Sequence, residues 1–364
     1  MSPSSSDYVD RKVTVSLPDM FKGFLVGNPV VNPYYEVVRI ESEDWLRRTM
    51  SLSSKQHGRV HYCDFSYFCA VLVPYASQEK LKIVSDWGNW VFLFDDMFDE
   101  GQLRNDPITS QHIINNLLSI MLPDRDRSSE EVVVTVHDSI YKRFTAVKPS
   151  PHILKHSSTV KRYVNAMTSY CAGALQHVED HAAARIPTIP EMLETRRMSI
   201  GVFPMYPLIE FAYDLNIPEE VFQHPTIQVL ENLGAEFVML MNDTLSYQKE
   251  ERENCPFNIV AVCRMAGSSA QEAFDEVGSL IDERFSVWKE AVRAVPSWGK
   301  DVDIQVHKYI QGIQNIVQAN LSWSFRTGRY FGQEAAKVRR SREVDVMMRP
   351  PFLSQQIMYS GIDV

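Results

Sequence analysis

Apolar residues recur at spacings of three and four along most of the chain, whereas the strict alternation of half-buried strands is scarce. This periodicity predicts helices. After a segment punctuated by Pro and Gly (17–33), the expected helices run near 41–52, 64–73, 77–99, 108–121, 129–145, 151–184, 190–200, 203–214, 226–251, 256–266, 270–294 and 301–330. Prolines and glycines mark the breaks between them. The predicted fold class is therefore all-α.

The breaks are short, and no segment differs enough in composition to mark a second domain. We therefore expect one helical domain over residues 1–364, with an N-terminal segment at 1–40. The last stretch, 334–364, combines a basic run with two prolines, and we expect it to be a loop, a tail or a lid over the site. Internal repeats of fixed period are not apparent, which argues against a helical solenoid.

Composition narrows the class of protein. Charged residues make up 23% of the chain, the formal net charge is −9 and no long basic run occurs, so we expect no nucleic-acid partner. The 5 cysteines lack the CxxC spacing of a zinc site and fit a reducing compartment. The start is polar, and no apolar run reaches the roughly 18 to 20 residues of a spanning helix. We therefore expect a cytoplasmic protein without a membrane anchor.

An acidic cluster follows the apolar segment Trp87–Phe94 and contains Asp95, Asp96 and Asp99. On a helix, Asp95 and Asp99 lie one turn apart on the same face, where their oxygens can converge on a hard cation such as Mg²⁺. Solvated charges at a helix end are the plain alternative. Here, however, the carboxylates would repel one another and oppose the helix dipole unless cations neutralised them. The cluster therefore predicts a metal site.

A second oxygen-rich motif consists of Asn242, Ser246 and Glu250. Steps of four residues drift by only about 40° each around an α-helix, so the three side chains share one face. Alone, this spacing usually marks a polar surface. Here the motif follows the strongly apolar stretch Phe237–Met241. Two such motifs on apolar helices predict two walls of one cavity with magnesium between them.

Basic residues accompany both motifs, namely Arg196, Arg197, Lys249 and Arg329. Each alone would be a surface charge. Arg329 and Tyr330 are better placed, because the largely apolar segment 321–325 precedes them and they are expected to end the last long helix at a cavity rim. A guanidinium group binds phosphate oxygens through two parallel hydrogen bonds, which favours a diphosphate ligand.

In this order and with these gaps, the motifs resemble those of the microbial class I terpene synthases, especially the fungal sesquiterpene cyclases. The resemblance covers most of the chain. Asp95–Asp99 is similar to the aspartate-rich motif of that family, and Asn242, Ser246 and Glu250 to its second metal triad. Lys249 and the pair Arg329–Tyr330, with Trp323 six residues before it, are similar to the diphosphate-binding residues.

A further arginine of the family senses the diphosphate. By its distance upstream of the triad Arg196 matches this residue, although Arg197 is adjacent. The next two positions of the sensor motif would fall at Ser199 and Ile200, where the acidic linker of many relatives is missing.

The resemblance implies a helical bundle around a deep apolar pocket, three Mg²⁺ ions and a prenyl diphosphate substrate, and it favours farnesyl diphosphate. The implied catalytic residues are Asp95, Asp96, Asp99, Arg329 and Tyr330; the metal ligands Asp95, Asp99, Asn242, Ser246 and Glu250; the diphosphate ligands Arg196, Lys249, Arg329 and Tyr330. Metal binding would pull the leaving oxygen from carbon, and the resulting carbocation would cyclise. Residues around Asp95–Gly101 and 196–206 are similar to mushroom cyclases that first close an eleven-membered ring, so protoilludene is the expected product.

A carbocation needs aromatic faces and a dry pocket. Phe92 and Trp323 are the candidate pocket-lining residues, with core packing as the alternative for both. For Phe65, Trp87, Trp90 and Tyr206 packing is favoured. The final proton is expected to leave to the diphosphate, and the protein to be a monomer or homodimer.

Other classes of protein fit the sequence less well. A chain-elongating prenyl transferase shares the fold, but normally carries a second aspartate-rich motif where this chain has the Asn242 motif. A cyclase that starts by protonation needs a DxDD run, which is missing. A metal-dependent phosphohydrolase could use His137–Asp138 and residues 177–181, where a solvated helix face is the favoured interpretation. A helical scaffold would have no reason to align two metal motifs.

Overall fold

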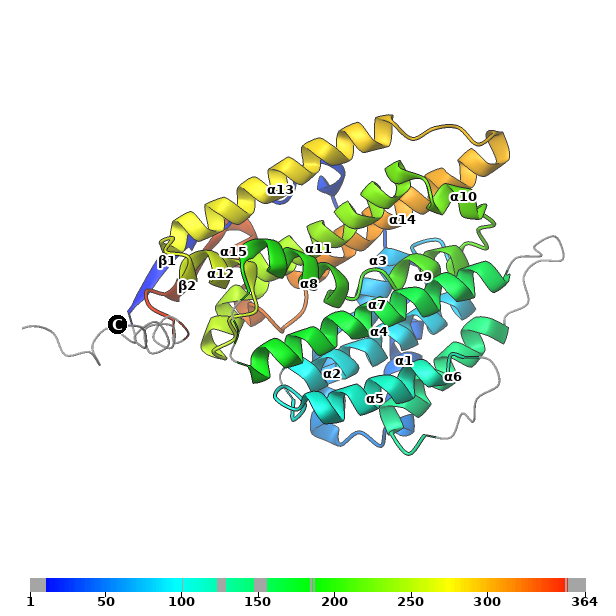
Figure 1. The fold of residues 1–364 in the computed structure, drawn as a ribbon, viewed down its shortest axis with the longest axis horizontal. Helices are drawn as coiled ribbons and strands as arrows, with labels where there is room; N and C mark the ends of the chain where they lie inside the picture. Colours follow the sequence, from blue (N-terminus) through cyan, green and yellow to red (C-terminus); the bar gives the residue numbers. More distant parts are fainter. Residues whose placement is uncertain are drawn as a thin grey trace, which may run out of the picture.

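The computed structural model describes residues 11–99, 101–122, 129–146, 156–183, 185, 187–350 and 352. Its helices are α1 (Tyr35–Thr49), α2 (Ser54–Cys63), α3 (Phe65–Leu72), α4 (Gln78–Asp99), α5 (Pro107–Ser119), α6 (Val132–Ala146), α7 (His156–Ala182), α8 (Ile189–Ser199), α9 (Met205–Ala212), α10 (Glu219–Phe222), α11 (Pro225–Arg252), α12 (Ile259–Met265), α13 (Ala270–Arg293), α14 (Lys300–Ser324) and α15 (Ala335–Ser341). Short 3-10 helices η2 (Gly23–Leu25) and η3 (Gly332–Glu334) and two strands, β1 (Lys12–Ser16) and β2 (Glu343–Met347), complete the described elements. The all-α prediction is confirmed (Figure 1).

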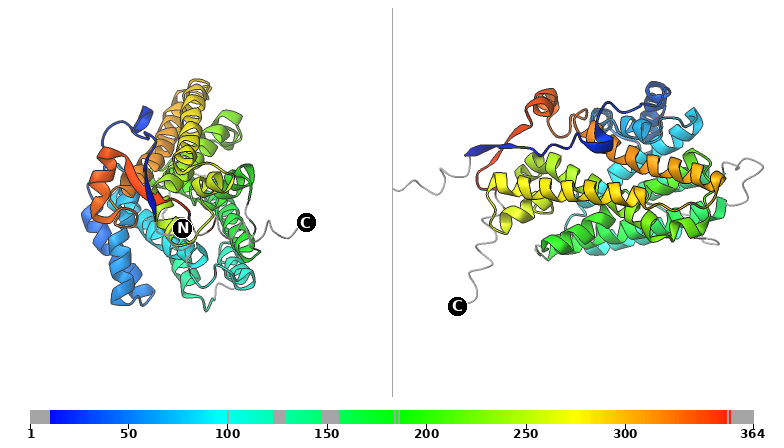
Figure 2. Two further views of the ribbon diagram at one scale, coloured as in Figure 1. Left: turned by 90° about the vertical axis from the view of Figure 1, so that its left-hand side faces the viewer. Right: turned by 90° about the horizontal axis from the view of Figure 1, so that it is seen from above.

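Six helices form a closed ring of contacts. Starting from α4, the order of packed neighbours is α3, α14, α11, α8 and α7, and α7 packs against α4 again. Figure 2 shows the bundle end-on and from above. The two helices that carry the predicted metal motifs, α4 and α11, are therefore separate walls of one ring, joined through α3 and α14 on one side and through α7 and α8 on the other.

Local sequence signals explain where the ring helices begin. Helix α8 starts with a capping box, in which Thr188 and Glu191 satisfy each other's backbone N–H groups, with Pro190 in the first turn. Helix α11 begins at Pro225, whose missing N–H would be unpaired in any case. These capping residues fix where α8 and α11 begin.

Several boundaries differ from the sequence prediction, and the short helix α10 was not predicted. Helix α1 begins at Tyr35, earlier than 41, and a capping box at Ser53 starts the unpredicted α2. Helix α14 ends at Ser324, so the prediction that Arg329 and Tyr330 end the last long helix was wrong. Near the α14 end, the N–H groups of Arg326 and Thr327 both turn back to the carbonyl of Trp323, and the chain leaves the helix.

The segment expected to be a loop or tail from residue 334 is ordered over much of its length. After α15, strand β2 pairs antiparallel with β1, with Thr14 opposite Asp345, at one end of the bundle (Figure 1). The prediction failed because β2 is short, although it alternates charged and apolar residues and buries Val344 and Val346. Residues 353–364 of the predicted tail lie outside the described residues.

Strand β2 is fastened to α11 beside the second metal motif. The Gln248 amide donates to the Asp345 carbonyl at 2.8 Å, and the Met347 N–H donates to Glu251 Oε1 at 2.9 Å. Arg264 of α12 also donates to the Met347 carbonyl at 2.9 Å. The small sheet thus supports the end of α11 that carries Glu250.

The buried apolar side chains form one cluster that runs through the ring and the helices packed outside it. Within the described ranges, no helix has the length and apolar character needed to span a membrane. All five cysteines are unpaired.

Candidate active site

The helix ring encloses an apolar cavity of about 140 Å³. Every ring helix contributes a lining side chain, for example Phe65 from α3, Trp87 from α4, Tyr170 from α7, Ser199 from α8, Val238 from α11 and Trp323 from α14. A polar compartment of about 380 Å³ adjoins it. Asp99, Arg196, Glu250 and Arg329 line both spaces and so mark their junction. An elongated ligand with a charged head and an apolar tail fits this division.

Asp95 and Asp99 occupy the α4 wall at this junction. Tyr170 donates a hydrogen bond to Asp95 Oδ1 at 2.8 Å. Burial raises the pKa of Asp95 to about 6. The Asp99 carboxyl is accessible from the compartment, yet the surrounding protein and then the Asp95 charge raise its pKa well above the usual range. The two carboxylates therefore form a site where a positive charge would be favourable.

Asp96 lies on a different side of α4, because neighbouring helix residues point about 100° apart. Its Oδ1 is 3.2 Å from Arg329 Nη2, and its Oδ2 is 3.0 Å from Arg59 Nη2. The Arg329 guanidinium also lies over the Phe92 ring, 4.3 Å from its centroid. In this structure Asp96 therefore holds Arg329 at the mouth of the cavity, while Asp95 and Asp99 face the junction.

The α11 wall carries the second motif. Asn242 and Glu250 line the apolar cavity, and the buried hydroxyl of Ser246 between them has no hydrogen-bond partner among the described residues. Asn242 donates to the Tyr330 hydroxyl at 2.9 Å. Glu250 accepts from Asn258 at 2.9 Å, and its pKa is raised by burial and then by the charge of Asp243. Asn242 and Glu250 thus face the same cavity, whereas Ser246 is buried between them and lines neither space.

The choice between two adjacent arginines of α8 is resolved by position. Arg196 is buried, lines both spaces, forms an ion pair with Asp243 and donates to Asn242 Oδ1 at 3.3 Å. Arg197 instead pairs with Glu236 at 2.7 Å. Asp243 was missed by the sequence reasoning, although a carboxylate inside an apolar helical stretch was the signal that could have found it. Only Arg196 of this pair lines the site.

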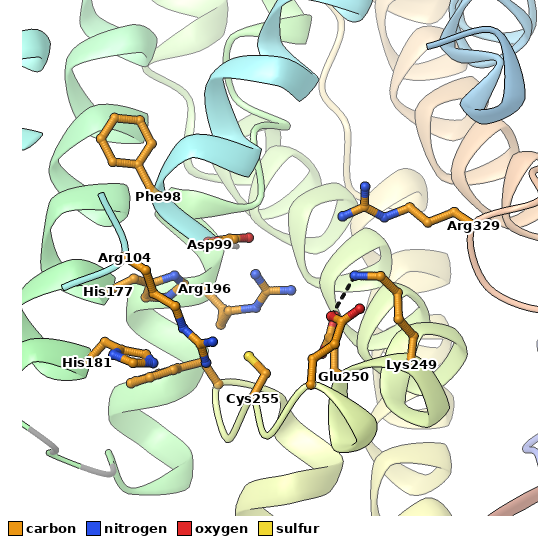
Figure 3. Close-up of a pocket in the computed structure, with 12 residues that line it drawn as sticks. Phe98, Asp99, Arg104, His177, His181, Arg196, Lys249, Glu250, Cys255 and Arg329 are labelled. Carbon is orange, nitrogen blue, oxygen red and sulfur yellow. Dashed lines mark hydrogen bonds and ion pairs between the residues drawn. The ribbon is translucent and has the colours of Figure 1, made fainter. Parts of the chain in front are cut away.

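The predicted phosphate-binding residues approach from several elements. In Figure 3, Asp99, Arg196, Lys249, Glu250 and Arg329 point toward a common space. Lys249 lines the polar compartment, where its ammonium group is 2.8 Å from Glu253 Oε2. Arg329 and Tyr330 reach the site from the turn after α14 rather than from a helix. The structure therefore brings all four predicted phosphate-binding residues to the walls of the two spaces.

An aromatic cluster lines the cavity below the junction. The Phe65 ring packs at a tilt against Phe92 and Trp323, with ring centroids 3.7 and 4.5 Å apart, and the Trp323 ring meets Tyr330 edge-on at 5.7 Å. Trp323 is oriented by donating its indole N–H to the Cys63 carbonyl at 2.6 Å. The expectation that Phe65 serves packing alone was wrong, because it lines the cavity together with Phe92 and Trp323.

The other predicted aromatic residues divide into one that lines the cavity and two that serve core packing. Trp87 lines the cavity, and its indole N–H donates to the Tyr163 hydroxyl at 2.8 Å, so the expectation of plain packing was wrong for it too. Trp90 is fully buried and donates to the Val133 carbonyl at 2.8 Å, and Tyr206 is buried against α11. For these two residues, the packing prediction is confirmed.

The histidines of α7 are not on a solvated face, so that interpretation was wrong. His177 is buried, and both His177 and His181 lie against the Phe257 ring, with centroids 5.8 and 5.6 Å apart. Burial lowers the pKa of His177 to about 3. His137 is packed elsewhere, on α6, where its Nε2 lies 2.7 Å from the Tyr163 hydroxyl. The structure thus separates the histidines that a phosphohydrolase would have combined.

The donor atoms fit a hard divalent cation. All five predicted ligands offer oxygen, the unpartnered buried hydroxyl of Ser246 needs a partner, and the carboxylates of the α4 wall have raised pKa values that a cation would reverse. In the described ranges, no three His, Cys, Asp or Glu residues are grouped so that they alone could hold a metal. Mg²⁺ commonly keeps water and substrate phosphate in its coordination shell, which suits such sparse protein ligands.

Comparison with known proteins agrees with this geometry. Residues 86–286 match the model described as terpene synthase family 2, C-terminal metal binding. Silphinene synthase of Penicillium patulum is 35% identical over 349 residues, covering 93% of this chain and 91% of that protein. Terpene cyclase 4 of Gibberella fujikuroi is 32% identical, covering 93% and 90% of the two chains. Cycloaraneosene synthase of Sordaria araneosa is 31% identical, covering 91% and 90%.

Solved structures share the fold. The crystal structure of α-eudesmol synthase aligns with a TM-score of 0.72 at 18% identity, covering 83% of this chain and 98% of that one. Linalool/nerolidol synthase from Streptomyces clavuligerus, in complex with 2-fluorogeranyl diphosphate, aligns with a TM-score of 0.73 at 18% identity, covering 85% and 100%. At such low identity, the likeness to these two structures shows the helical fold alone.

Proposed function

This chain belongs to terpene synthase family 2, and from that premise we propose that it ionises farnesyl diphosphate with the help of Mg²⁺ and cyclises the carbocation to a sesquiterpene hydrocarbon, releasing diphosphate. The enzyme is then a carbon–oxygen lyase. The observation that carries the proposal is the junction of Asp99, Arg196, Glu250 and Arg329, which joins a polar space lined by carboxylates and basic side chains to an aromatic cavity. This is where the bond between a charged head and an apolar tail would be broken.

We propose Asp95 and Asp99 as metal ligands on the α4 wall and Asn242, Ser246 and Glu250 on the α11 wall. When bound, Mg²⁺ supplies Lewis acidity that neutralises diphosphate charge and weakens the carbon–oxygen bond. Three ions are expected, as in the family that the motifs resemble. Because the pKa of Asp95 is raised to about 6, protons compete with a cation for its carboxylate as the pH falls toward 6.

The cationic residues would hold the diphosphate in register with the cavity. Arg196 and Arg329 line both spaces, so their guanidinium groups can bind the head of a substrate whose tail lies among the aromatic rings. Lys249 lines the polar compartment only, and Tyr330 lines the cavity only. Together the four residues would stabilise negative charge as it develops on the leaving diphosphate.

The apolar cavity would shape the carbocation. Phe65, Phe92, Trp87 and Trp323 present π faces or edges and exclude water, and the electron-rich faces of aromatic rings attract cations. The final proton is proposed to leave to the bound diphosphate. Protoilludene stays the predicted product.

The test is incubation of the purified protein with farnesyl diphosphate, with and without Mg²⁺, and with isopentenyl diphosphate in a parallel reaction. Analysis of volatile hydrocarbons should give a magnesium-dependent cyclic sesquiterpene. Longer prenyl diphosphates would instead identify a chain-elongating transferase. Absence of turnover with farnesyl, geranyl and geranylgeranyl diphosphate would contradict the proposal.

A matched pair of variants tests the site assignment in the same assay. Asn242→Ala and Glu250→Ala should each abolish turnover, and Arg196→Gln should reduce it strongly. Arg197→Gln is the control, because this neighbour pairs with Glu236 and does not line either space. Near-normal activity of both Asn242→Ala and Glu250→Ala would overturn the metal assignment.

A further inference from the structure

The polar compartment extends beyond the junction. Its outer part is lined by residues that the proposed reaction does not use, among them Arg104, His177, His181, Cys255 and Phe257. Arg104 lies in the turn between α4 and α5, which the buried Leu103 anchors to the core. In Figure 3 it lies on the same side as the two histidines, across the space from Arg329.

Arg104 differs from the other arginines of the compartment. Arg196 is paired with Asp243 and Arg329 with Asp96. For Arg104 the contacts found within the described ranges are limited to a 3.5 Å hydrogen bond to the Asn254 carbonyl, and its buried Nε has no hydrogen-bond partner there. A guanidinium without a carboxylate partner leaves N–H donors available to an anionic ligand that enters the compartment.

The surroundings of Arg104 favour a small, highly charged oxyanion. Burial and then the positive charge of Arg104 lower the pKa of His181, so this imidazole stays neutral and can donate or accept a hydrogen bond. Phe257 backs both imidazoles, and Lys249 lines the same compartment. A planar guanidinium fork binds phosphate oxygens through parallel hydrogen bonds.

We propose that the outer part of the polar compartment is a binding subsite for inorganic diphosphate, with Arg104 as its main ligand. The proposal rests on the proposed function. When the carbon–oxygen bond breaks, both electrons stay with the oxygen and the diphosphate leaves as an anion at the junction. Along the compartment, the outer subsite is the next place where that anion meets a positive charge without a carboxylate partner. The diphosphate is bound there by hydrogen bonds alone.

The experiment is calorimetric titration of the full chain with inorganic diphosphate in the presence of Mg²⁺, without turnover. Arg104→Gln should raise the Kd for diphosphate about tenfold, the effect of losing a charged hydrogen-bonding partner. The matched control is Arg252→Gln, which removes the same charge from an exposed position at the end of α11. We expect less than about a twofold change for the control.

Two results would overturn the subsite. An unchanged Kd for diphosphate in Arg104→Gln would show that Arg104 does not bind it. Equal losses of affinity for inorganic diphosphate and for an unreactive thio analogue of farnesyl diphosphate would place Arg104 at the head of the substrate instead. Should Arg104→Gln not fold, Arg104→Ala carries the same test, and Arg104→Lys should recover part of the affinity because it keeps the charge.

The outcome is separable from that of the proposed function. If the protein makes no terpene but its diphosphate affinity depends on Arg104, the subsite stands and the reaction is wrong. If it makes a sesquiterpene while Arg104→Gln binds diphosphate like the wild type, the reaction stands and the subsite is wrong.

Discussion

The carboxylates in the two halves of α4 have different partners. Asp86, fully buried, accepts hydrogen bonds from Ser42 and Lys82, each at 2.6 Å, and pairs with Arg143. One end of the same helix carries Asp95, whose hydrogen bond comes from the neutral hydroxyl of Tyr170. A carboxylate neutralised within the protein stabilises the fold, whereas one without a cation is prepared for a ligand that brings positive charge.

The largest contrast is expected in turnover. Asp95→Asn should lower kcat/KM for farnesyl diphosphate by about 10³-fold or more, because an amide cannot replace the charge of a carboxylate ligand. The free energy of unfolding of this variant without metal should not fall, since Asp95 forms no ion pair in the described structure. Steady-state kinetics and urea denaturation measure the two quantities. A variant that loses stability and keeps turnover would reverse the roles given to the two ends of α4.

Asp86→Asn should show the opposite behaviour. Removing this carboxylate leaves Lys82 and Arg143 without their buried partner, and breaking such a pair costs about 3 kcal/mol. Lys82 is partly buried, and burial lowers its pKa. Water therefore cannot fully replace the interaction that its ammonium group loses with Asp86. Urea denaturation gives the loss, and turnover per folded molecule should stay close to wild type. Asp138→Asn is the comparison, since Asp138 pairs with the exposed Lys142.

The free energy of unfolding should depend on pH through helix α6, which packs against α4. Helix α6 supplies both Arg143 and the buried His137, whose pKa is lowered to about 3 by burial. Because the unfolded chain binds this proton near its ordinary pKa of about 6.5, stability is present above that pH and falls as the pH drops toward 3. From pH 6.5 to 5 the loss attributable to His137 is about 1.6 kcal/mol. His137→Gln should flatten the profile by that amount, and an unchanged slope would contradict it.

The smallest effect concerns metal without substrate. Mg²⁺ at ten times its Kd should stabilise the wild type by about 1.4 kcal/mol, and this gain should vanish in Asp95→Asn but persist in Asp86→Asn. Thermal denaturation with and without Mg²⁺ measures it, with Ca²⁺ as a test of selectivity. Equal stabilisation of both variants would mean that the cation binds elsewhere.

Sequence periodicity was sufficient for the helices that carry chemistry. Asp95 and Asp99, and likewise Asn242 and Glu250, follow from helical spacing alone, because a helix fixes which of its residues share a face. The rotation of α4 was also implicit in the apolar residues before Asp95. These parts of the site were therefore predictable before any tertiary contact was known.

Features that depend on contacts between distant segments were not predictable. The choice of Arg196 over Arg197 is made by Asp243 on another helix, and the end of α14 is set by a turn that brings Arg329 over the Phe92 ring. Phe65 enters the cavity because α3 packs against both α4 and α14. Arg104 carried no signal in the sequence, since an arginine in a turn looks like any surface charge.

The pairing of β1 with β2 sets the order in which parts of the enzyme can fold during synthesis. Residues 12–16 must wait during synthesis for residues 343–347, and the same late strand secures α11 beside Glu250 through Gln248 and Glu251. Contacts of such wide sequence separation form slowly and late. The end of α11 that carries Glu250 therefore gains its hydrogen bonds to β2 only after residues 343–347 have been made.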